Sequence, residues 1–272
     1  MKTILLILAL ASALTTGLHS QTPKDLTVLN WSTAYTDFPE YLNGKIKELH
    51  HHFYWAIQKN GQIEKGTLLT EKEHQDNSIY YDFQLFFDPS GNLLRSDYIG
   101  DNSAVVFSYL NEFRNNKQLK EIWVNNNTTV SGEASFNYNE NGLLKDVIMT
   151  WIAPDSTGKL AILTDAKGNR TQMKIFDSHN VYTSRTDYLW DENNHVDQII
   201  SYSAKDQLVN KMELTYNDHG FIKTLKQYDA DGKILFDTAG DYTYDNKGNW
   251  LTCVWSVSGK PKFLCERTYL YY

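Results

Sequence analysis

Three consecutive histidines, His50, His51 and His52, form the densest cluster of side chains in the sequence that could do chemistry. On a β-strand alternate residues share a face, so His50 and His52 would point the same way. Such a pair can chelate a metal if a third ligand, such as His74, folds over it. No second motif of acidic or histidine ligands accompanies the cluster. We therefore expect no metal and no cofactor, and keep His50, His52 and His74 as the candidates for a metal site.

The two cysteines, Cys253 and Cys265, are the second pair of residues whose spacing suggests chemistry. If the last hairpin turns through residues 258–260, Val257 faces Pro261 and the same register places Cys253 opposite Cys265. Directly opposed residues on antiparallel strands have Cβ atoms about 4.5 Å apart, a distance that a disulfide tolerates. We predict a Cys253–Cys265 disulfide that staples this hairpin, whereas a register slip of one residue would leave two buried free thiols.

Catalytic motifs are otherwise absent from the sequence. It contains no G-x-S-x-G nucleophile elbow, no P-loop and no G-x-G-x-x-G segment. Carboxylates are abundant, but a glycosidase needs two of them about 5 to 9.5 Å apart, which a sequence does not show. Asp229, Asp231 and Gly232 fit a hairpin turn, without the loop of a calcium site. We predict that the protein is not an enzyme, with a metal-dependent or carboxylate-based hydrolase as an alternative.

Charge and hydropathy argue against two classes of partner. The chain carries 26 Lys and Arg against 33 Asp and Glu, a net charge of −7, and the repeats have no basic run that would bind phosphates. Beyond the N-terminus no apolar stretch approaches the ~20 residues of a membrane-spanning helix. Many expected strands carry charged side chains among their outward candidates, unlike a lipid-facing barrel. We therefore expect no nucleic-acid partner and no membrane span in the mature chain.

Residues 1–20 have the composition of a secretory signal peptide, with one Lys, an apolar run and small residues before Gln21. We place the cleavage after Ser20. The segment contains no Cys, so a lipid anchor is not expected. The mature protein is therefore expected to be exported, to the periplasm or to the cell surface.

The elements that would position these residues follow a regular rhythm of polar turns, about one every thirteen residues from Asp88 to Gly259. Between the turns lie segments of about eight residues rich in aromatic and β-branched side chains, many of them alternating, which is typical of half-buried β-strands. The turns form two interleaved series, each with a period near twenty-six residues. The first is Gly91, Asn116, Gly142, Gly168, Asn194, Gly220 and Gly248; the second is Asn102, Asn127, Asp155, Asn180, Asp206, Gly232 and Gly259.

The same rhythm divides the chain. Residues 21–44 lack it and are expected to form an irregular lead-in, residues 45–70 an opening hairpin, and residues 79–272 the regular repeats. Many strands end in an aromatic residue followed by Asp or Asn and then a Gly or Asn. The Asp or Asn side chain can bond the backbone two residues further on, and Gly accepts the positive φ of the turn. We therefore expect residues 45–272 to form a single β-repeat domain.

The sequence Tyr-Asp-Asn-Lys-Gly-Asn at residues 244–249, which recurs in degenerate form at other turns, resembles the YD repeats of Rhs-type proteins. Residues 44–49 and 61–66 are also similar to the start of small exported YD-repeat-like proteins from Gram-negative envelopes. The resemblance covers residues 44–272 and implies a repetitive β-structure. It brings no catalytic residues with it.

Adjacent strands twist by about 20 to 25°, so a long meander must coil or curl. We predict an all-β fold, an elongated and curved antiparallel meander of about 15 to 18 strands that forms an open coil or a curled sheet. The function we predict is a non-enzymatic exported binding or scaffold protein of the bacterial envelope, with an envelope protein or polysaccharide as partner. An alternative is a glycan- or cell-wall-binding module that uses exposed aromatic rings.

Overall fold

The computed structural model describes residues 26–30, 39–77, 79, 81–152 and 156–272. The predicted signal peptide, Trp31 and the turn at Asp155 lie outside these residues. One helix, α1 (Glu71–Asp76), and a 3-10 turn, η1 (Asp101–Ser103), accompany the strands. The strands are β1 (Leu26–Asn30), β2 (Pro39–Asn43), β3 (Ile46–Lys59), β4 (Gln62–Leu68), β5 (Asp82–Phe87), β6 (Leu93–Ile99), β7 (Val105–Arg114), β8 (Lys117–Asn125), β9 (Thr129–Tyr138), β10 (Leu144–Trp151), β11 (Ser156–Thr164), β12 (Arg170–Phe176), β13 (Tyr182–Trp190), β14 (Val196–Ser203), β15 (Leu208–Tyr216), β16 (Ile222–Asp229), β17 (Ile234–Tyr244), β18 (Trp250–Val257) and β19 (Lys260–Tyr271).

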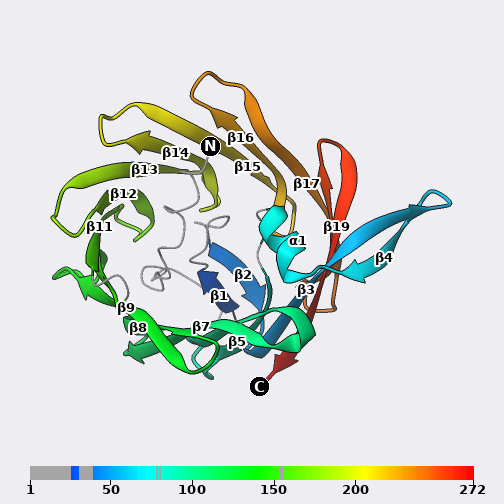
Figure 1. The fold of residues 1–272 in the computed structure, drawn as a ribbon, viewed down its shortest axis with the longest axis horizontal. Helices are drawn as coiled ribbons and strands as arrows, with labels where there is room; N and C mark the ends of the chain where they lie inside the picture. The colour runs from blue at the N-terminus through cyan, green and yellow to red at the C-terminus, as the bar shows by residue number, and fades with distance from the viewer. Residues whose placement is uncertain (1–25, 31–38, 78, 80, 153–155) are drawn as a thin grey trace.

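The sheet closes into an antiparallel barrel of 16 strands, formed by β3 and by β5 to β19 in sequence order (Figure 1). The closing pair is β19 with β3, from Phe263 opposite Trp55 to Tyr271 opposite Ile46. β5 joins the other edge of β3, from Glu48 to His51, and β4 pairs with the distal part of β3 as a projecting ribbon. The all-β prediction is confirmed, but the open coil or curled sheet is wrong. Closure removes the two exposed edges that an open meander would leave, and it depends on one long-range pairing that local periodicity does not encode.

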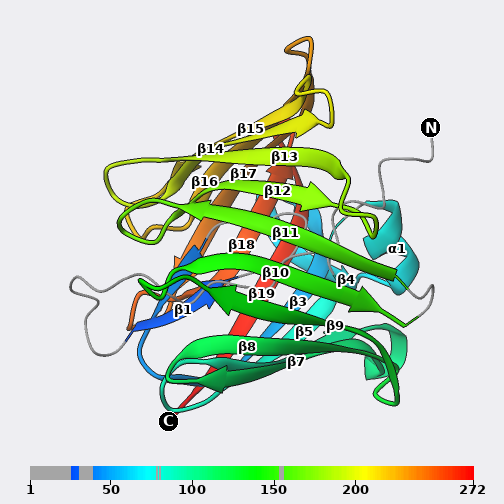
Figure 2. The same cartoon turned by 90° about the vertical axis from the view of Figure 1, so that its left-hand side faces the viewer.

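The two series of turns are the two rims of this barrel, because consecutive antiparallel strands turn at alternate ends (Figure 2). Asp245 illustrates the turn chemistry: its Oδ1 accepts hydrogen bonds from the backbone N–H of Lys247 at 2.8 Å and of Asn249 at 2.9 Å. Gly248 has φ +86°, a conformation that other residues rarely adopt. The Asx bond predicted from the sequence is therefore confirmed, with a second bond two residues further on. The same pair of bonds occurs at Asp88, Asn139, Asp165, Asp177, Asn217 and Asp229.

Aromatic side chains at the first rim extend the ladders where strand pairing ends. Tyr216 on β15 donates its hydroxyl to the carbonyl of Val196 on β14 at 2.9 Å, beyond the last paired residues Gln198 and Glu213. A polar atom at the tip of the ring is needed for this bond, which gives a reason for Tyr and Trp over Phe here. Equivalent bonds are Tyr138 to Gln118, Trp190 to Arg170, Tyr242 to Ile222 and Tyr269 to Trp250.

The second rim carries α1, in a segment that the repeat rhythm leaves out (Figure 2). Thr70 and Glu73 form a capping box: the Glu73 N–H donates to Thr70 Oγ1 at 3.3 Å, and the Thr70 N–H donates to Glu73 Oε2 at 2.8 Å. Glu73 Oε1 also accepts the indole N–H of Trp55 at 2.9 Å, which attaches the helix to β3. No helix in the described part of the chain is long and apolar enough to cross a membrane.

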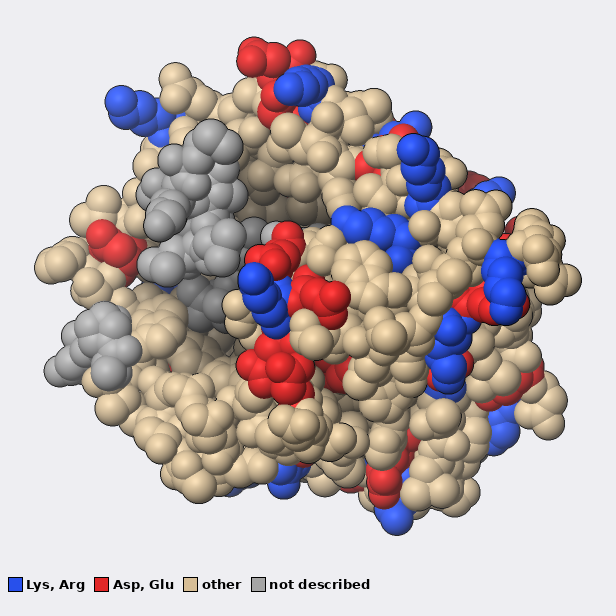
Figure 3. Space-filling view, turned by 45° about the vertical axis from the view of Figure 1, so that its right-hand side comes forward, with Lys and Arg blue, Asp and Glu red and all other residues tan. Residues whose placement is uncertain are grey.

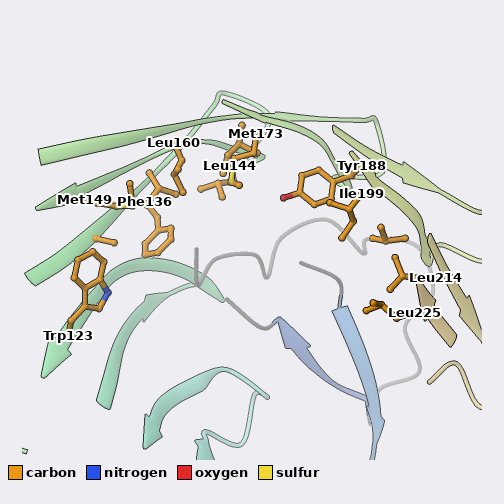
Figure 4. Close-up of a cluster of buried hydrophobic side chains, with 14 residues drawn as sticks. Trp123, Phe136, Leu144, Met149, Leu160, Met173, Tyr188, Ile199, Leu214 and Leu225 are labelled. Carbon is orange, nitrogen blue, oxygen red and sulfur yellow. The ribbon is translucent and has the colours of Figure 1, made fainter. Parts of the chain in front are cut away.

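The hairpin of β1 and β2 lies inside the ring, where both views place it (Figures 1 and 2). Leu42 of β2 is fully buried there and packs in a cluster with Leu49, Phe83 and Trp250 of the wall. A second apolar cluster lines the wall from β8 to β16, with its side chains directed toward the interior (Figure 4). The two clusters place the apolar residues of the repeats inside the barrel.

Candidate functional site

A buried ion pair holds β2 against the barrel wall. Arg267 of β19 forms two parallel bonds with Glu40 of β2, Nη1 to Oε1 at 2.5 Å and Nη2 to Oε2 at 3.0 Å. The indole N–H of Trp250 donates to the same Oε1 at 2.8 Å, and the guanidinium lies 3.8 Å from the centre of the Trp250 ring. Burial alone would lower the pKa of Arg267, but the Glu40 carboxylate outweighs it and the pKa lies above its ordinary value. Arg267 therefore keeps its positive charge beside Glu40.

His51 completes this arrangement. Its Nδ1 lies 3.2 Å from Nε of Arg267, and its ring packs against Phe53 and Phe83 with centroids 4.4 Å away. Burial first, and then the charge of Arg267, holds the pKa of His51 well below its ordinary value. The ring is therefore neutral, and because Nδ1 accepts the guanidinium N–H, the proton is on Nε2.

Two further contacts fix β2 near the first rim. The N–H of Asn43 donates to Asn249 Oδ1 at 2.7 Å, and Asn249 Nδ2 donates back to the carbonyl of Asn43 at 2.8 Å. The hydroxyl of Tyr41 accepts a bond from Asn194 Nδ2 at 3.3 Å. β2 is thus bonded to turns and strands more than a hundred residues away in the sequence, so it is a fixed internal element.

The wall opposite this anchor is apolar. Leu160, Tyr188, Val196 and Leu214 are at most 2% exposed and belong to one continuous cluster (Figure 4). None of the six tryptophans in the described residues is exposed: Trp55, Trp123, Trp151, Trp190, Trp250 and Trp255 are buried or half-buried. The described tryptophans therefore form no platform of exposed rings of the kind that the glycan-binding alternative required.

Between this apolar wall and the second rim, the inward positions become polar. Thr186 on β13 lies opposite Ser201 on β14, and Ser201 lies opposite Asn210 on β15, so the three side chains share one face. Two inward atoms of this polar belt, Ser184 Oγ and Asn210 Oδ1, are inaccessible to solvent and have no hydrogen-bond partner. Buried polar atoms are normally paired, so this belt has unused hydrogen-bonding capacity.

The outward face of the barrel carries ion pairs as well as exposed apolar side chains such as Leu163 and Leu189. Lys120 pairs with Glu133 across β8 and β9 at 2.6 Å, and Lys211 with Glu213 along β15 at 2.6 Å. Lys65 and Glu266 form a further pair at 2.8 Å. Figure 3 shows separate groups of acidic and basic side chains among other residues, and a hollow beside the charged side chains near its centre.

The histidine candidates separate in the structure. His52 Nδ1 bonds Asp82 Oδ2 at 2.7 Å, and His74 Nε2 lies 3.7 Å from Asp82 Oδ1, while Nε2 of His50 lies 3.5 Å from Glu48 Oε2. The hydrogen bond to Asp82 raises the pKa of His52. Among the described residues no group of three or more His, Cys, Asp or Glu side chains could hold a metal ion. His52 and His74 thus converge on Asp82, and His50 does not join them.

The cysteines occupy opposed positions. Cys253 and Cys265 are partners in the β18–β19 register, both fully buried and both free thiols. The expected pairing of Val257 with Pro261 is wrong, because Val257 lies opposite Lys260 and a register shift between Trp255 and Ser256 compensates. The disulfide stays a prediction, for which the strand register provides the opposition.

Sequence analysis did not single out Arg267 and Glu121, two buried charged residues on the inner face; Arg170, 6% exposed and 4.5 Å from the centre of the Tyr188 ring, is a third. Glu40 and Arg267 are 227 residues apart, so their contact leaves no local trace. Each of the two nevertheless interrupts an apolar strand face. Arg267 alternates with Cys265 and Tyr269, and Glu121 with Trp123. A charged residue on an otherwise apolar strand face was the signal in the sequence that could have identified them as candidate site residues.

Comparison with known proteins finds the barrel among solved structures, while no family model and no curated protein matches the chain. A porin-like protein from Bacteroides uniformis is similar with a TM-score of 0.52 at 10% identity, covering 83% of this chain and 96% of that one. A porin-like protein from Bacteroides vulgatus gives 0.46 at 7% identity, covering 83% and 98%. The fold is therefore that of a porin-like β-barrel.

This finding corrects the resemblance to Rhs-type YD-repeat proteins. The toxin complex TcdB2-TccC3 matches with a TM-score of only 0.27 and over 12% of its length. The Tyr-Asp and Gly-Asn residues that suggested the family serve the Asx turns of the barrel rims. Such turns arise wherever short hairpins recur, so the motif reports turn chemistry and by itself establishes no family.

Proposed function

We propose that the protein is an exported, non-enzymatic binding protein of the bacterial envelope, which holds a ligand inside its barrel. In this proposal residues 1–20 are the signal peptide, residues 21–44 supply the internal hairpin, and residues 45–272 form the barrel. The ligand is apolar over most of its length and has an uncharged hydrogen-bonding end. The porin-like fold and the predicted signal peptide support the envelope location.

The observation that carries the proposal is the polarity of the two faces of the wall. A ring of 16 strands is too wide to be filled by its own side chains. Its inner wall carries a continuous cluster of buried apolar side chains, whereas its outer face combines the Lys120–Glu133 and Lys211–Glu213 pairs with scattered exposed apolar residues. A lipid-embedded channel has the opposite pattern, with an apolar exterior and a polar interior. This distribution favours an apolar ligand in the interior and water outside.

The polar belt narrows the class of ligand. Ser184, Thr186, Ser201 and Asn210 are uncharged, so they suit hydroxyl, ester or amide groups better than an ionised head group. The unpaired Ser184 Oγ and Asn210 Oδ1 would gain partners from such a ligand. Since the belt lies between the apolar wall and the second rim, the polar end of the ligand would face that rim.

The test is extraction of the purified mature protein with organic solvent, followed by mass spectrometry, and rebinding of the extracted compounds. Ser184→Ala should weaken rebinding about five- to tenfold, because it removes a hydrogen bond to the ligand, without lowering stability, because that hydroxyl has no protein partner. Ser135→Ala, at an exposed outward position, is the matched control. If no compound binds, or both variants rebind alike, the proposal fails.

The alternative function suggested by the porin-like fold is that of a membrane pore. Fractionation after expression with the signal peptide separates the two functions. The proposal expects the mature protein in the detergent-free soluble fraction and no conductance across lipid bilayers. Recovery only in detergent, with stable conductance, would instead establish a membrane pore.

A further inference from the structure

Glu121 of β8 is a buried acidic side chain on the inner face that the hairpin anchor does not use. It is 2% exposed and lies at an inward position between Asn111 of β7 and Ala134 of β9. Its Oε1 accepts the indole N–H of Trp123 at 2.7 Å, whereas its Oε2 is buried without a hydrogen-bond partner. Burial raises the pKa of Glu121 to about 8, and only the Trp123 bond acts against this shift. Burial, without a contribution from a charged neighbour, therefore determines the shift of this carboxyl group.

The surroundings of Glu121 are aromatic. Trp123 lies 5.5 Å from Trp151, measured between ring centroids. On β6 and β7, Tyr98 lies 5.7 Å from Tyr109, in an edge-on arrangement. Burial first, and then the Glu121 carboxylate, raises the pKa of Tyr98, which places the two groups near each other. Burial accounts for most of that rise, so Tyr98 is uncharged at neutral pH.

Gly132 of β9 keeps Trp123 in place. The two residues are direct partners in the β8–β9 register, and a Cβ atom at Gly132 would lie 2.5 Å from Cε3 of Trp123. Any larger side chain would displace the indole and with it the hydrogen bond to Glu121. The backbone is thus arranged so that the indole N–H bonds one carboxylate oxygen and leaves the other unused.

The chemistry of this arrangement selects a particular cation. A hydrated inorganic ion such as Ca²⁺ needs six or more oxygen ligands, and the described residues form no acidic or histidine group of three around any point. An organic ammonium needs fewer polar partners, because aromatic rings stabilise its charge while one carboxylate pairs with it. We propose that Glu121, Trp123 and Tyr98 form a subsite in the barrel interior that binds the ammonium group of an organic amine.

This subsite lies on the wall formed by β6 to β9, apart from the polar belt on β13 to β15. It rests on the proposed function only in requiring that small molecules enter the barrel. The ammonium would replace the proton that the buried carboxyl otherwise retains. Binding at pH 7 therefore releases about one proton to the buffer.

The experiment compares benzylamine with benzyl alcohol, a neutral compound of nearly the same shape, by isothermal titration calorimetry at pH 7 in buffers of different ionisation enthalpy. Wild type should bind the amine about tenfold more tightly than the alcohol and release about one proton. Glu121→Gln keeps an oxygen for Trp123 but removes the charge, so it should bind both compounds alike and release none. Glu133→Gln, which is outward and paired with Lys120, is the control and should behave as wild type.

The outcomes separate this subsite from the function of the barrel. An amine preference that survives in Glu121→Gln, or no preference in wild type, overturns the subsite. Binding of benzyl alcohol alone would leave the proposed binding function intact. Should Glu121→Gln not fold, the carboxyl signal of Glu121 in wild type decides by NMR. Its pKa must fall when benzylamine is added, and an unchanged pKa overturns the proposal.

Discussion

The Glu40–Arg267 pair provides the sharpest test of the internal hairpin. The substitution Glu40→Gln removes the negative charge and leaves a guanidinium that is only 4% exposed without its counterion. Breaking a buried ion pair from one side costs about 3 to 5 kcal/mol. Because the Glu40 side chain retains 16% exposure and Trp250 and His51 still contact the site, we expect the low end, about 3 kcal/mol.

The measurement is urea unfolding of wild type, Glu40→Gln, Arg267→Met and the double variant. Removing both charges leaves no unpaired ion, so the double variant should be more stable than the sum of the single losses predicts, by about 2 kcal/mol. Hydrogen exchange adds a local readout. The N–H of Asn43, bonded to Asn249 at 2.7 Å, should exchange faster in Glu40→Gln, while β14 to β16 should stay protected.

The control substitution is at Glu266, the residue next to Arg267 in the sequence. Glu266 points outward and pairs with Lys65 on the exposed surface, so Glu266→Gln should leave the unfolding curve nearly unchanged. A loss below about 1 kcal/mol for Glu40→Gln, or strictly additive effects in the double variant, would refute the reasoning that β2 is held through a buried charge. Fast exchange at Asn43 already in wild type would refute the fixed position of the hairpin.

Three further predictions concern the wall. Burial raises the pKa of Glu121 from 4.5 to about 8, so its ionisation destabilises the folded protein. As the pH rises from 4.5 to 8, the free energy of unfolding of wild type, measured in urea, should fall by up to about 5 kcal/mol relative to Glu121→Gln. Equal pH profiles of the two proteins would contradict this. The exported protein should contain a Cys253–Cys265 disulfide, visible as linked peptides in a non-reducing digest, and reducing agent should lower its melting temperature; two alkylatable thiols after unfolding would exclude the bond. Asp245→Ala removes the bonds to the N–H groups of Lys247 and Asn249 and should cost about 1 to 2 kcal/mol in urea unfolding, which an unchanged midpoint would contradict.

Local sequence chemistry explains why the strands and turns were predictable. Alternation such as Leu208, Asn210, Met212 and Leu214 follows the period of a strand, and the Asp-x-x-Gly turns satisfy their own backbone groups within five residues. Helix α1 had a local signal too, the capping box of Thr70 and Glu73, which the repeat rhythm obscured. These features depend on neighbours in the sequence.

The candidate site was not predictable by the same means. The His50–His52 pair was singled out because the residues are adjacent, but the structure turns His50 to Glu48 and His52 to Asp82. The site that the fold does build joins Glu40 to Arg267 and surrounds Glu121 with side chains from neighbouring strands. What could have been noticed is a charge on an apolar strand face, at Glu121 and at Arg267.

The sequence by itself determined the strands and their turns, because short hairpins fix the pairing of consecutive strands, whereas the opposition of Cys253 and Cys265 also depends on the register shift between Trp255 and Ser256. Tertiary structure alone decided that the last strand meets β3, that the ring therefore closes and that β2 lies inside it. Alternation with a period of two residues separates two faces of a strand, but it does not show which face lies inside a barrel. Only closure makes one face an interior, where the apolar cluster and the buried charged residues Glu121, Arg170 and Arg267 then lie.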